Sequence, residues 1–208
     1  IVIPLLPYWA VNNLGASDFT YGLLVASYSA MQFIFAPIWG RLSDRTGRRP
    51  VILFGLTGTI IGFGLLAFTA LYSDTLSMLF ASRILSGVFT AATLPTSQAY
   101  ISDSTTGKDR AKGFGLLGAA FGLGFAMGPP IGSLLYTLGI SIGGVGFEVP
   151  AIFAVILASI NLLGAVSFLP ESLTDSTKQR RAEFRAMQES MKMKGGRVTT
   201  FGGMVVAL

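Results

Sequence analysis

The sequence predicts an all-α integral membrane protein, and three observations carry this prediction. The 208 residues are 51% apolar and only 12% charged, which is about half the charge of a soluble domain. Five apolar runs are long enough, at about 20 residues each, to cross the roughly 30 Å of bilayer hydrocarbon as helices. The loops between these runs alternate between basic and free of Lys and Arg, as in proteins that cross a membrane several times.

The expected spans follow one another along most of the chain. Two partial apolar runs, Ile1 to Val11 and Phe201 to Leu208, flank the five complete ones. The first lacks the basic start and the small-residue cleavage site of a signal peptide, so we interpret it as the remainder of a truncated helix in a longer chain. The complete runs are Thr20 to Trp39, Val51 to Leu71, Leu76 to Ile101, Gly113 to Leu138 and Phe147 to Leu169.

The basic residues predict the orientation of the chain. Fourteen of the fifteen Lys and Arg residues lie in segments 41–49, 102–112 and 170–197. The positive-inside rule places these three segments in the cytoplasm, in a multi-pass protein of the plasma or inner membrane surrounded by lipid. The net charge of +5 is therefore an orientation signal, and we expect no nucleic-acid partner because the charges form no patch on a folded soluble face.

One long polar segment, residues 171–197, follows the last complete span. We interpret it as a cytoplasmic linker between two membrane units, because its polarity is not accompanied by a sustained apolar face. The alternative is a short basic amphipathic helix over residues 180–191 that lies on the membrane surface. Contact of this segment with anionic lipid stays open.

The composition excludes most enzyme chemistry. The chain contains no cysteine and no histidine, so the usual metal ligands, the thiol nucleophile and the usual general base are missing. The phosphate-loop pattern is also absent, which argues against ATP hydrolysis. We therefore expect no enzyme activity, no catalytic residue, no metal site and no cofactor.

The loop between the second and third runs is the most informative one. Gly47 allows a tight reversal between two helices, and Pro50 suits the first turn of the next helix because its missing N–H costs nothing there. Asp44 lies at the C-terminal end of a helix, where the macrodipole disfavours an anion. We therefore expect Asp44 to have a partner, either a neighbouring arginine or a helix N-terminus elsewhere.

This loop, G-x-L-S-D-R-x-G-R-R over residues 40–49, resembles the signature between helices 2 and 3 of the major facilitator superfamily. Further motifs are similar to those of its drug:proton antiporter branch and of tetracycline-efflux-type carriers. They are Pro4-x-x-Pro7, Tyr28-Ser-Ala-Met-Gln32-Phe, Leu79-x-x-x-Arg83-x-x-Ser86-Gly87, Tyr100-Ile-Ser-Asp103, Gly124-x-x-x-Gly128-Pro129-x-x-Gly132 and Leu169-Pro170-Glu171-Ser172.

The resemblance implies a helical bundle that is the N-terminal six-helix half of such a protein, with helix 1 truncated. Residues 1–170 would form this bundle, 171–197 the linker between the halves and 198–208 the start of helix 7. The missing C-terminal half, six more helices of the same polypeptide, would be its partner. The resemblance also implies a conformational switch that latches the cytoplasmic side, formed by Gly40, Asp44, Arg45, Gly47, Arg48 and Arg49.

Arg83 is the one basic residue inside a predicted span. Burying it costs about 2.5–3.5 kcal/mol on insertion scales, so it should face water or a partner; the alternative is a side chain that extends outward to the membrane surface. The resemblance places it in a central cavity, where it would couple proton and substrate movements or hold an anionic partner.

Three other groups of residues have weaker signals. Gly124, Gly128 and Gly132 form a smooth stripe for helix packing, Pro129 favours a kink, and the resemblance makes them the helix 5 antiporter motif, which seals against the other half. Tyr28 and Gln32 share a helix face that either lines a cavity or packs against a neighbour. We expect a structural role for Asn161, an N-cap role for Asp18 and an interface position for Glu148.

These observations together predict secondary active transport by alternating access. The resemblance implies proton-coupled efflux of small amphipathic molecules or drugs, with the proton as coupling ion. A metabolite or sugar carrier is the alternative, and a non-transporting membrane receptor or assembly unit is a third. Tetracycline itself is not expected, because the third span has no acid where its carriers have one, and Gly62 lies in that neighbourhood. The proton-titrating acid is expected outside these 208 residues.

Overall fold

The computed structural model describes residues 5–73, 75–144, 146–171, 183, 186–187, 198–201 and 204–207. The chain divides into two compact units, Ile1–Ser172 and Leu173–Leu208. The first unit contains the helices that concern the site, and the second contains a short pair of strands. Each unit is considered by itself.

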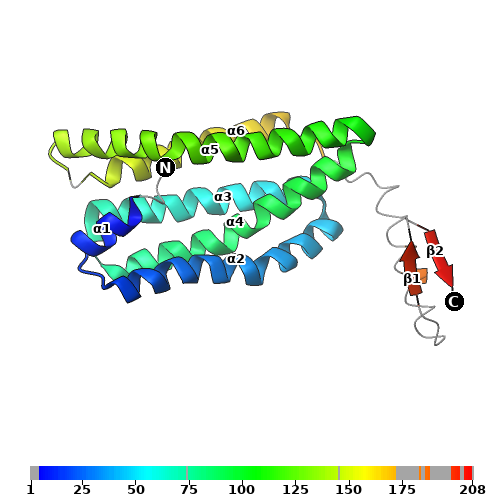
Figure 1. The fold of residues 1–208 in the computed structure, drawn as a ribbon, viewed down its shortest axis with the longest axis horizontal. Coiled ribbons are helices and arrows are strands. Elements are labelled where there is room, and N and C mark those ends of the chain that lie inside the picture. Colours follow the sequence, from blue (N-terminus) through cyan, green and yellow to red (C-terminus); the bar gives the residue numbers. More distant parts are fainter. Residues whose placement is uncertain are drawn as a thin grey trace. The chain divides into compact units, whose positions relative to one another are not determined.

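The first unit is a bundle of long helices that run side by side (Figure 1). Within the described residues, five helices are long and apolar enough to cross a membrane, as the sequence predicts. A short helix, α1, precedes them, and a π-helical turn covers Thr69–Ser73. The helices are α1 (Leu6–Asn12), α2 (Asp18–Thr46), α3 (Arg48–Phe68), α4 (Leu76–Ser104), α5 (Gly107–Ser141) and α6 (Glu148–Phe168).

Helix α2 begins and ends with local signals. The hydroxyl of Ser17 accepts a hydrogen bond from the backbone N–H of Thr20 at 3.2 Å, so Ser17 is the N-cap. Asp18, for which the sequence predicts this role, is instead the first helical residue, where its charge is favourable to the helix dipole. At the other end, Gly47 has a φ of +116°, which only glycine adopts readily, and the chain reverses into α3.

Small residues bring α3 and α4 into close contact. A Cβ added at Gly58 would overlap the ring of Phe89, and one at Gly62 would overlap Ser86. A Cβ at Gly55 would lie 2.9 Å from the Thr93 hydroxyl. Because lipid provides no hydrophobic drive between helices, such close approach is how membrane helices gain packing energy. The three glycines therefore fix the position of α3 against α4.

Helix α2 is joined to α4 in a similar way. The indole Nε1 of Trp39 donates a hydrogen bond of 2.8 Å to the carbonyl oxygen of Val88. One residue earlier, a Cβ on Gly87 would approach the Tyr28 carbonyl oxygen at 2.6 Å and the Met31 Cβ at 2.8 Å. Helices α2, α3 and α4 therefore form a tightly packed three-helix unit.

The apolar core lies where α1 meets the ends of the longer helices. Trp9 of α1 stacks on Phe147 at a centroid separation of 4.6 Å, and both side chains are fully buried. Leu24, Leu66 and Leu79 from α2, α3 and α4 belong to the same cluster. This core lies at the end of the bundle where the loops carry no Lys or Arg, which the positive-inside rule makes the outer end.

Helix α5 is largely exposed in this unit. Gly128 and Gly132 are buried, whereas a Cβ added at Gly124 would meet no atom within 4 Å. The helix continues through Pro129 and Pro130. The predicted glycine stripe is therefore packed within this unit only toward its outer half.

Residues 198–208, expected to begin a further helix, differ from that expectation where they are described. Val198–Phe201 (β1) and Met204–Ala207 (β2) form an antiparallel pair in which Val198 lies opposite Ala207 and Phe201 opposite Met204. Five of these eight residues are Val or Thr, and β-branched side chains favour extended backbone. The assignment of 198–208 to a second membrane half stays a prediction.

The glycine contact at Gly58 predicts a specific loss of stability. We expect Gly58→Ala to lower the stability of the full-length protein in detergent by about 1–3 kcal/mol, because the added methyl group overpacks the α3–α4 contact. Gly64→Ala is the matched control, since nothing lies within 4 Å of a Cβ there. Thermal melting measures both variants, and Phe89→Leu should restore part of the loss. Equal melting temperatures for both glycine variants would contradict this packing account.

Candidate functional site

A cluster of charged side chains joins the cytoplasmic ends of four helices. It consists of Ser43 and Asp44 at the end of α2, Arg48 at the start of α3, Asp103 at the end of α4, and Glu171 just after α6. We call these five residues the Arg48 cluster. Figure 1 shows the end of α2, the start of α3 and the end of α4 at the same end of the bundle.

Arg48 is the centre of this cluster. Its Nη2 donates to the Asp44 carboxylate at 2.7 Å, its Nε to Asp103 at 2.9 Å and its Nη1 to the Ser43 hydroxyl at 2.6 Å. The planar guanidinium thus uses each of its nitrogens on a different partner, which the single ammonium of lysine could not reproduce. The Arg48 side chain is 4% exposed, against 31% for Asp44.

The electrostatics explain why two acids are present. Arg48 is the first residue of α3, where the positive end of the helix dipole disfavours a cation. Its burial adds a desolvation penalty that only close anionic partners can offset. Asp44, at the negative end of α2, has the opposite problem and is stabilised by the same ion pair. Each group is thus poorly placed in its own helix and well placed beside the other.

Glu171 contacts the backbone rather than the side chain of this segment. Its Oε1 accepts a hydrogen bond from the Arg48 N–H at 3.0 Å, and its Oε2 accepts one from the Arg49 N–H at 3.2 Å. The Arg49 side chain lies over α6, where its Nη2 donates to the Val166 carbonyl oxygen at 2.9 Å. The end of α6 is therefore bonded directly to the first turn of α3.

The predicted switch residues divide into two groups. Asp44 and Arg48 lie inside the cluster, with Gly47 and Arg49 beside it. The partner of Asp44 is a neighbouring arginine, the first of the two alternatives that the sequence leaves open. Arg45 is exposed, and Gly40 contributes only its carbonyl oxygen, which accepts from Ser43 at 2.8 Å.

Three cluster members occur in the motifs quoted from the sequence, but the sequence analysis assigned them no role in the site. Ser43 lies inside the motif, but its position gives no sign of its contact with Arg48. Asp103 and Glu171 follow the ends of apolar runs, and an acid at the end of a cytoplasmic helix was the available signal. Their partners are 55 and 123 residues away in the chain, so no local spacing connects them.

Arg83 lies in a second region, within the membrane-spanning part of α4. The residue is 6% exposed, and its guanidinium carbon lies 5.8 Å from the ring centroid of Tyr28, within the range of a cation–π contact. Within residues 5–171 as described, its Nε and Nη2 have no hydrogen-bond partner. Arg83 also lines a cavity of about 590 Å³ together with residues of α1, α2, α3 and α6.

Tyr28 and Gln32 share one face of α2, and Gln32 Nε2 donates to the Tyr28 hydroxyl at 3.1 Å. Tyr28 lines the Arg83 cavity, with Ser29 beside it on the same helix. Gln32 is not among the residues that line this cavity, and its contact with Tyr28 orients that ring.

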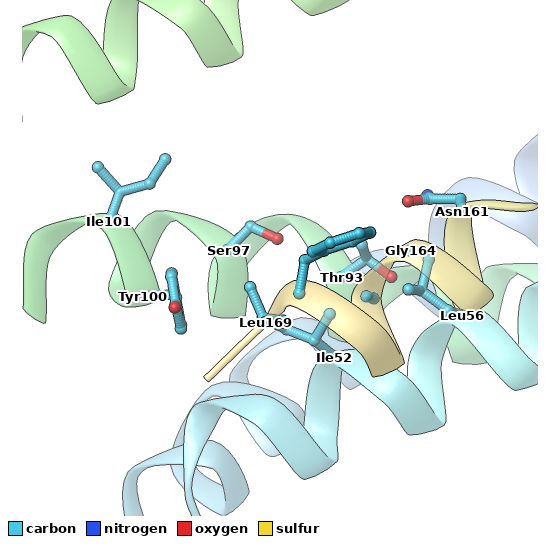
Figure 2. A pocket seen from close by; sticks show the side chains of 11 residues that line it. Ile52, Leu56, Thr93, Ser97, Tyr100, Ile101, Asn161, Gly164 and Leu169 are labelled. Carbon is cyan, nitrogen blue, oxygen red and sulfur yellow. The ribbon is translucent and has the colours of Figure 1, made fainter. Parts of the chain in front are cut away.

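A smaller cavity of about 400 Å³ lies between α3, α4 and α6 (Figure 2). Its polar lining comes from Thr93, Ser97 and Tyr100 of α4 and from Asn161 of α6. Asn161 also lines the Arg83 cavity. The structure thus places Asn161, expected to be structural, at the junction of two cavities. Gly124, Gly128 and Gly132 of α5 do not line either one.

Comparison with known proteins finds relatives that are similar in sequence over most of the chain. The tetracycline resistance protein of class H from Pasteurella multocida is 40% identical over 177 residues, covering 83% of this chain and 40% of the relative. The class C protein from Escherichia coli is 41% identical over 175 residues, covering 83% and 41%. Multidrug resistance protein 2 from Bacillus subtilis (strain 168) is 35% identical over 180 residues, covering 84% and 40%.

A solved structure adds similarity of fold. The human organic anion transporter MFSD10 (TETRAN) matches with a TM-score of 0.62 and 31% identity, over 81% of this chain and 38% of that protein. The chain therefore spans about 40% of the length of the curated relatives it matches. The family model described as Major Facilitator Superfamily matches residues 1–206. On this match and on the shared helical architecture, the chain belongs to the Major Facilitator Superfamily.

Proposed function

We propose that this chain is the N-terminal part of a secondary active transporter that exports small amphipathic molecules by alternating access, coupled to protons. The Arg48 cluster is the observation that carries the proposal. It holds a buried cation between acids from two other helices, at the cytoplasmic end of a membrane bundle. A transporter that changes shape needs such an element, because discrete polar contacts can be broken in one state and remade in another.

The names of the relatives support an efflux substrate of this class. Two are tetracycline resistance proteins and one is a multidrug resistance protein, while the structural relative is an organic anion transporter. The substrates that these names mention, tetracycline, drugs and organic anions, are small organic molecules with both polar and apolar parts. Tetracycline itself is not assigned to this chain, because α3 contains no acid in its span and Gly62 packs against Ser86, which leaves no room for one at position 62.

The two sites would have different roles in the transport cycle. The Arg48 cluster would latch the cytoplasmic side, with Asp44 and its neighbouring arginines Arg45, Arg48 and Arg49 as the latch residues. Arg83 would act within the membrane, where unpartnered guanidinium donors are costly unless a group of opposite charge approaches. We assign Arg83 to proton or substrate coupling. We assign the glycine stripe of α5 to packing against the second half, at its Gly124 end, which is open in this unit.

The first prediction concerns Asp44. In inverted vesicles that contain the full-length protein, we expect cationic dyes and drugs from a panel to collapse an imposed pH gradient. Asp44→Asn should reduce this response by about tenfold or more, because one charge-assisted hydrogen bond contributes about 1.5–3 kcal/mol. Expression should fall much less, since the amide keeps the shape of the side chain.

Asp109→Asn is the control for this experiment. Asp109 is an acid on the same side of the membrane, in an exposed pair with Lys112 at 3.7 Å, and such a pair contributes little. Equal loss of transport and expression in Asp44→Asn would show that Asp44 is merely structural. No response of the wild-type protein to any compound would overturn drug export and favour a metabolite carrier or a uniporter.

The second prediction concerns Arg83. We expect Arg83→Ala to abolish coupled transport and Arg83→Lys to keep part of it, because lysine keeps the charge but not the planar set of donors. Ile84→Ala is the control, as Ile84 is the exposed neighbour on the same helix. The same vesicle assay measures all three variants at matched expression. Unchanged transport in Arg83→Ala would place Arg83 outside the mechanism.

A further inference from the structure

The first turn of α3 has no capping side chain of its own. A helix leaves its first four backbone N–H groups without partners inside the helix, and a side chain at the N-cap position usually accepts one of them. Here the N-cap residue is Gly47, which has no side chain and therefore accepts no such hydrogen bond. The N–H groups of Arg48 and Arg49 are instead bound by the carboxylate of Glu171.

The fit of Glu171 against this turn is close. A Cβ added at Gly47 would lie 2.5 Å from Glu171 Oε2 and 3.0 Å from its carboxyl carbon. Position 47 therefore requires glycine for two reasons. Its φ is +116°, and the Glu171 carboxylate occupies the space that a side chain would fill. The sequence suggested the first reason alone, because the second depends on a residue more than 120 positions away in the chain.

Arg48 is thereby held from two sides. Its side chain is bonded to Asp44 and Asp103, and its backbone N–H is bonded to Glu171. Any movement of the end of α6 away from α3 must break the two bonds of Glu171 and the bond from Arg49 to Val166. Such a movement would also free the turn that fixes the guanidinium of Arg48.

We propose that Glu171 is a positioning residue for the conformational change: it caps α3 from the end of α6 and so sets the balance between the two states of the Arg48 cluster. This inference rests on the proposed alternating access. Glu171 is also the residue at which the polar segment 171–197 begins. The cap therefore ties the start of that segment to the switch residues.

Two measurements on the full-length protein test this proposal. Hydrogen exchange of the Arg48 and Arg49 amides measures the cap directly. Maleimide labelling of a cysteine at Ser29, which lines the Arg83 cavity, measures how often the cavity is open to one side. The 208 residues contain no cysteine, and any cysteine in the rest of the protein would be replaced by serine. Neither measurement needs a known substrate.

We expect Glu171→Ala to speed exchange at the Arg48 and Arg49 amides roughly 2- to 30-fold, the range that loss of an N-cap produces. The labelling rate at Ser29→Cys should shift by a similar factor, and drug-driven collapse of the pH gradient should fall. Glu171→Gln should lie between wild type and Glu171→Ala, because its single amide oxygen still accepts a hydrogen bond. Asp109→Ala is the control and should behave as wild type, because Asp109 is also a cytoplasmic acid but lies in the first turn of α5.

The outcomes separate the cap, the positioning role and the proposed function. Unchanged amide exchange in Glu171→Ala would show that Glu171 does not cap α3, which overturns the proposal. Faster exchange with unchanged labelling would show that the cap has a purely structural role, which also overturns it. Faster exchange with shifted labelling, in a protein that exports none of the compounds, would uphold the role of Glu171 while refuting drug export.

Discussion

The buried guanidinium of Arg48 is the constraint on which the cytoplasmic end of this bundle depends. A cation at the start of a helix, 4% exposed, is tolerated only where anions replace both the lost hydration and the unfavourable dipole. Asp44 and Asp103 supply those anions from α2 and α4. Because removing one member of such a group leaves an uncompensated buried charge, the ends of α2, α3 and α4 are held in one arrangement.

The rest of the bundle is held by apolar packing, so directional polar bonds of this kind are concentrated at the cytoplasmic end. Toward the middle, Gly55, Gly58 and Gly62 press α3 against α4, and at the outer end Trp9 and Phe147 close an apolar core. Packing of this kind is non-directional and changes gradually with distance. The Arg48 cluster, in contrast, consists of directional bonds that are either made or broken. A change of state is therefore expected in the bonds at the cytoplasmic end, while the glycine-packed middle of α3 and α4 keeps its arrangement.

The sequence predicted the spans well, because hydrophobic length and the distribution of charge are local properties. It also predicted that Asp44 has a partner, since an anion at the end of α2 is unfavourable without one, and left a nearby arginine or a helix N-terminus elsewhere as the alternatives. The contacts of Asp103 and Glu171 could not be predicted, because their partners are set by how helices pack and not by any spacing in the chain. The N-cap of α2 was predicted one position late, at Asp18 instead of Ser17. Both residue types are good caps, and only the backbone geometry distinguishes them.

The energetics of the cluster suit a switch better than a permanent lock. Moving a two-state equilibrium from 1:99 to 99:1 takes about 5.5 kcal/mol, and a charge-assisted hydrogen bond contributes about 1.5–3 kcal/mol. The exchange of two or three such bonds is thus enough to reverse the populations. Arg48 makes three with its side chain, and Glu171 accepts two more from the backbone. If a second state satisfied only some of these groups, the difference would be within reach of one bound substrate or one transferred proton.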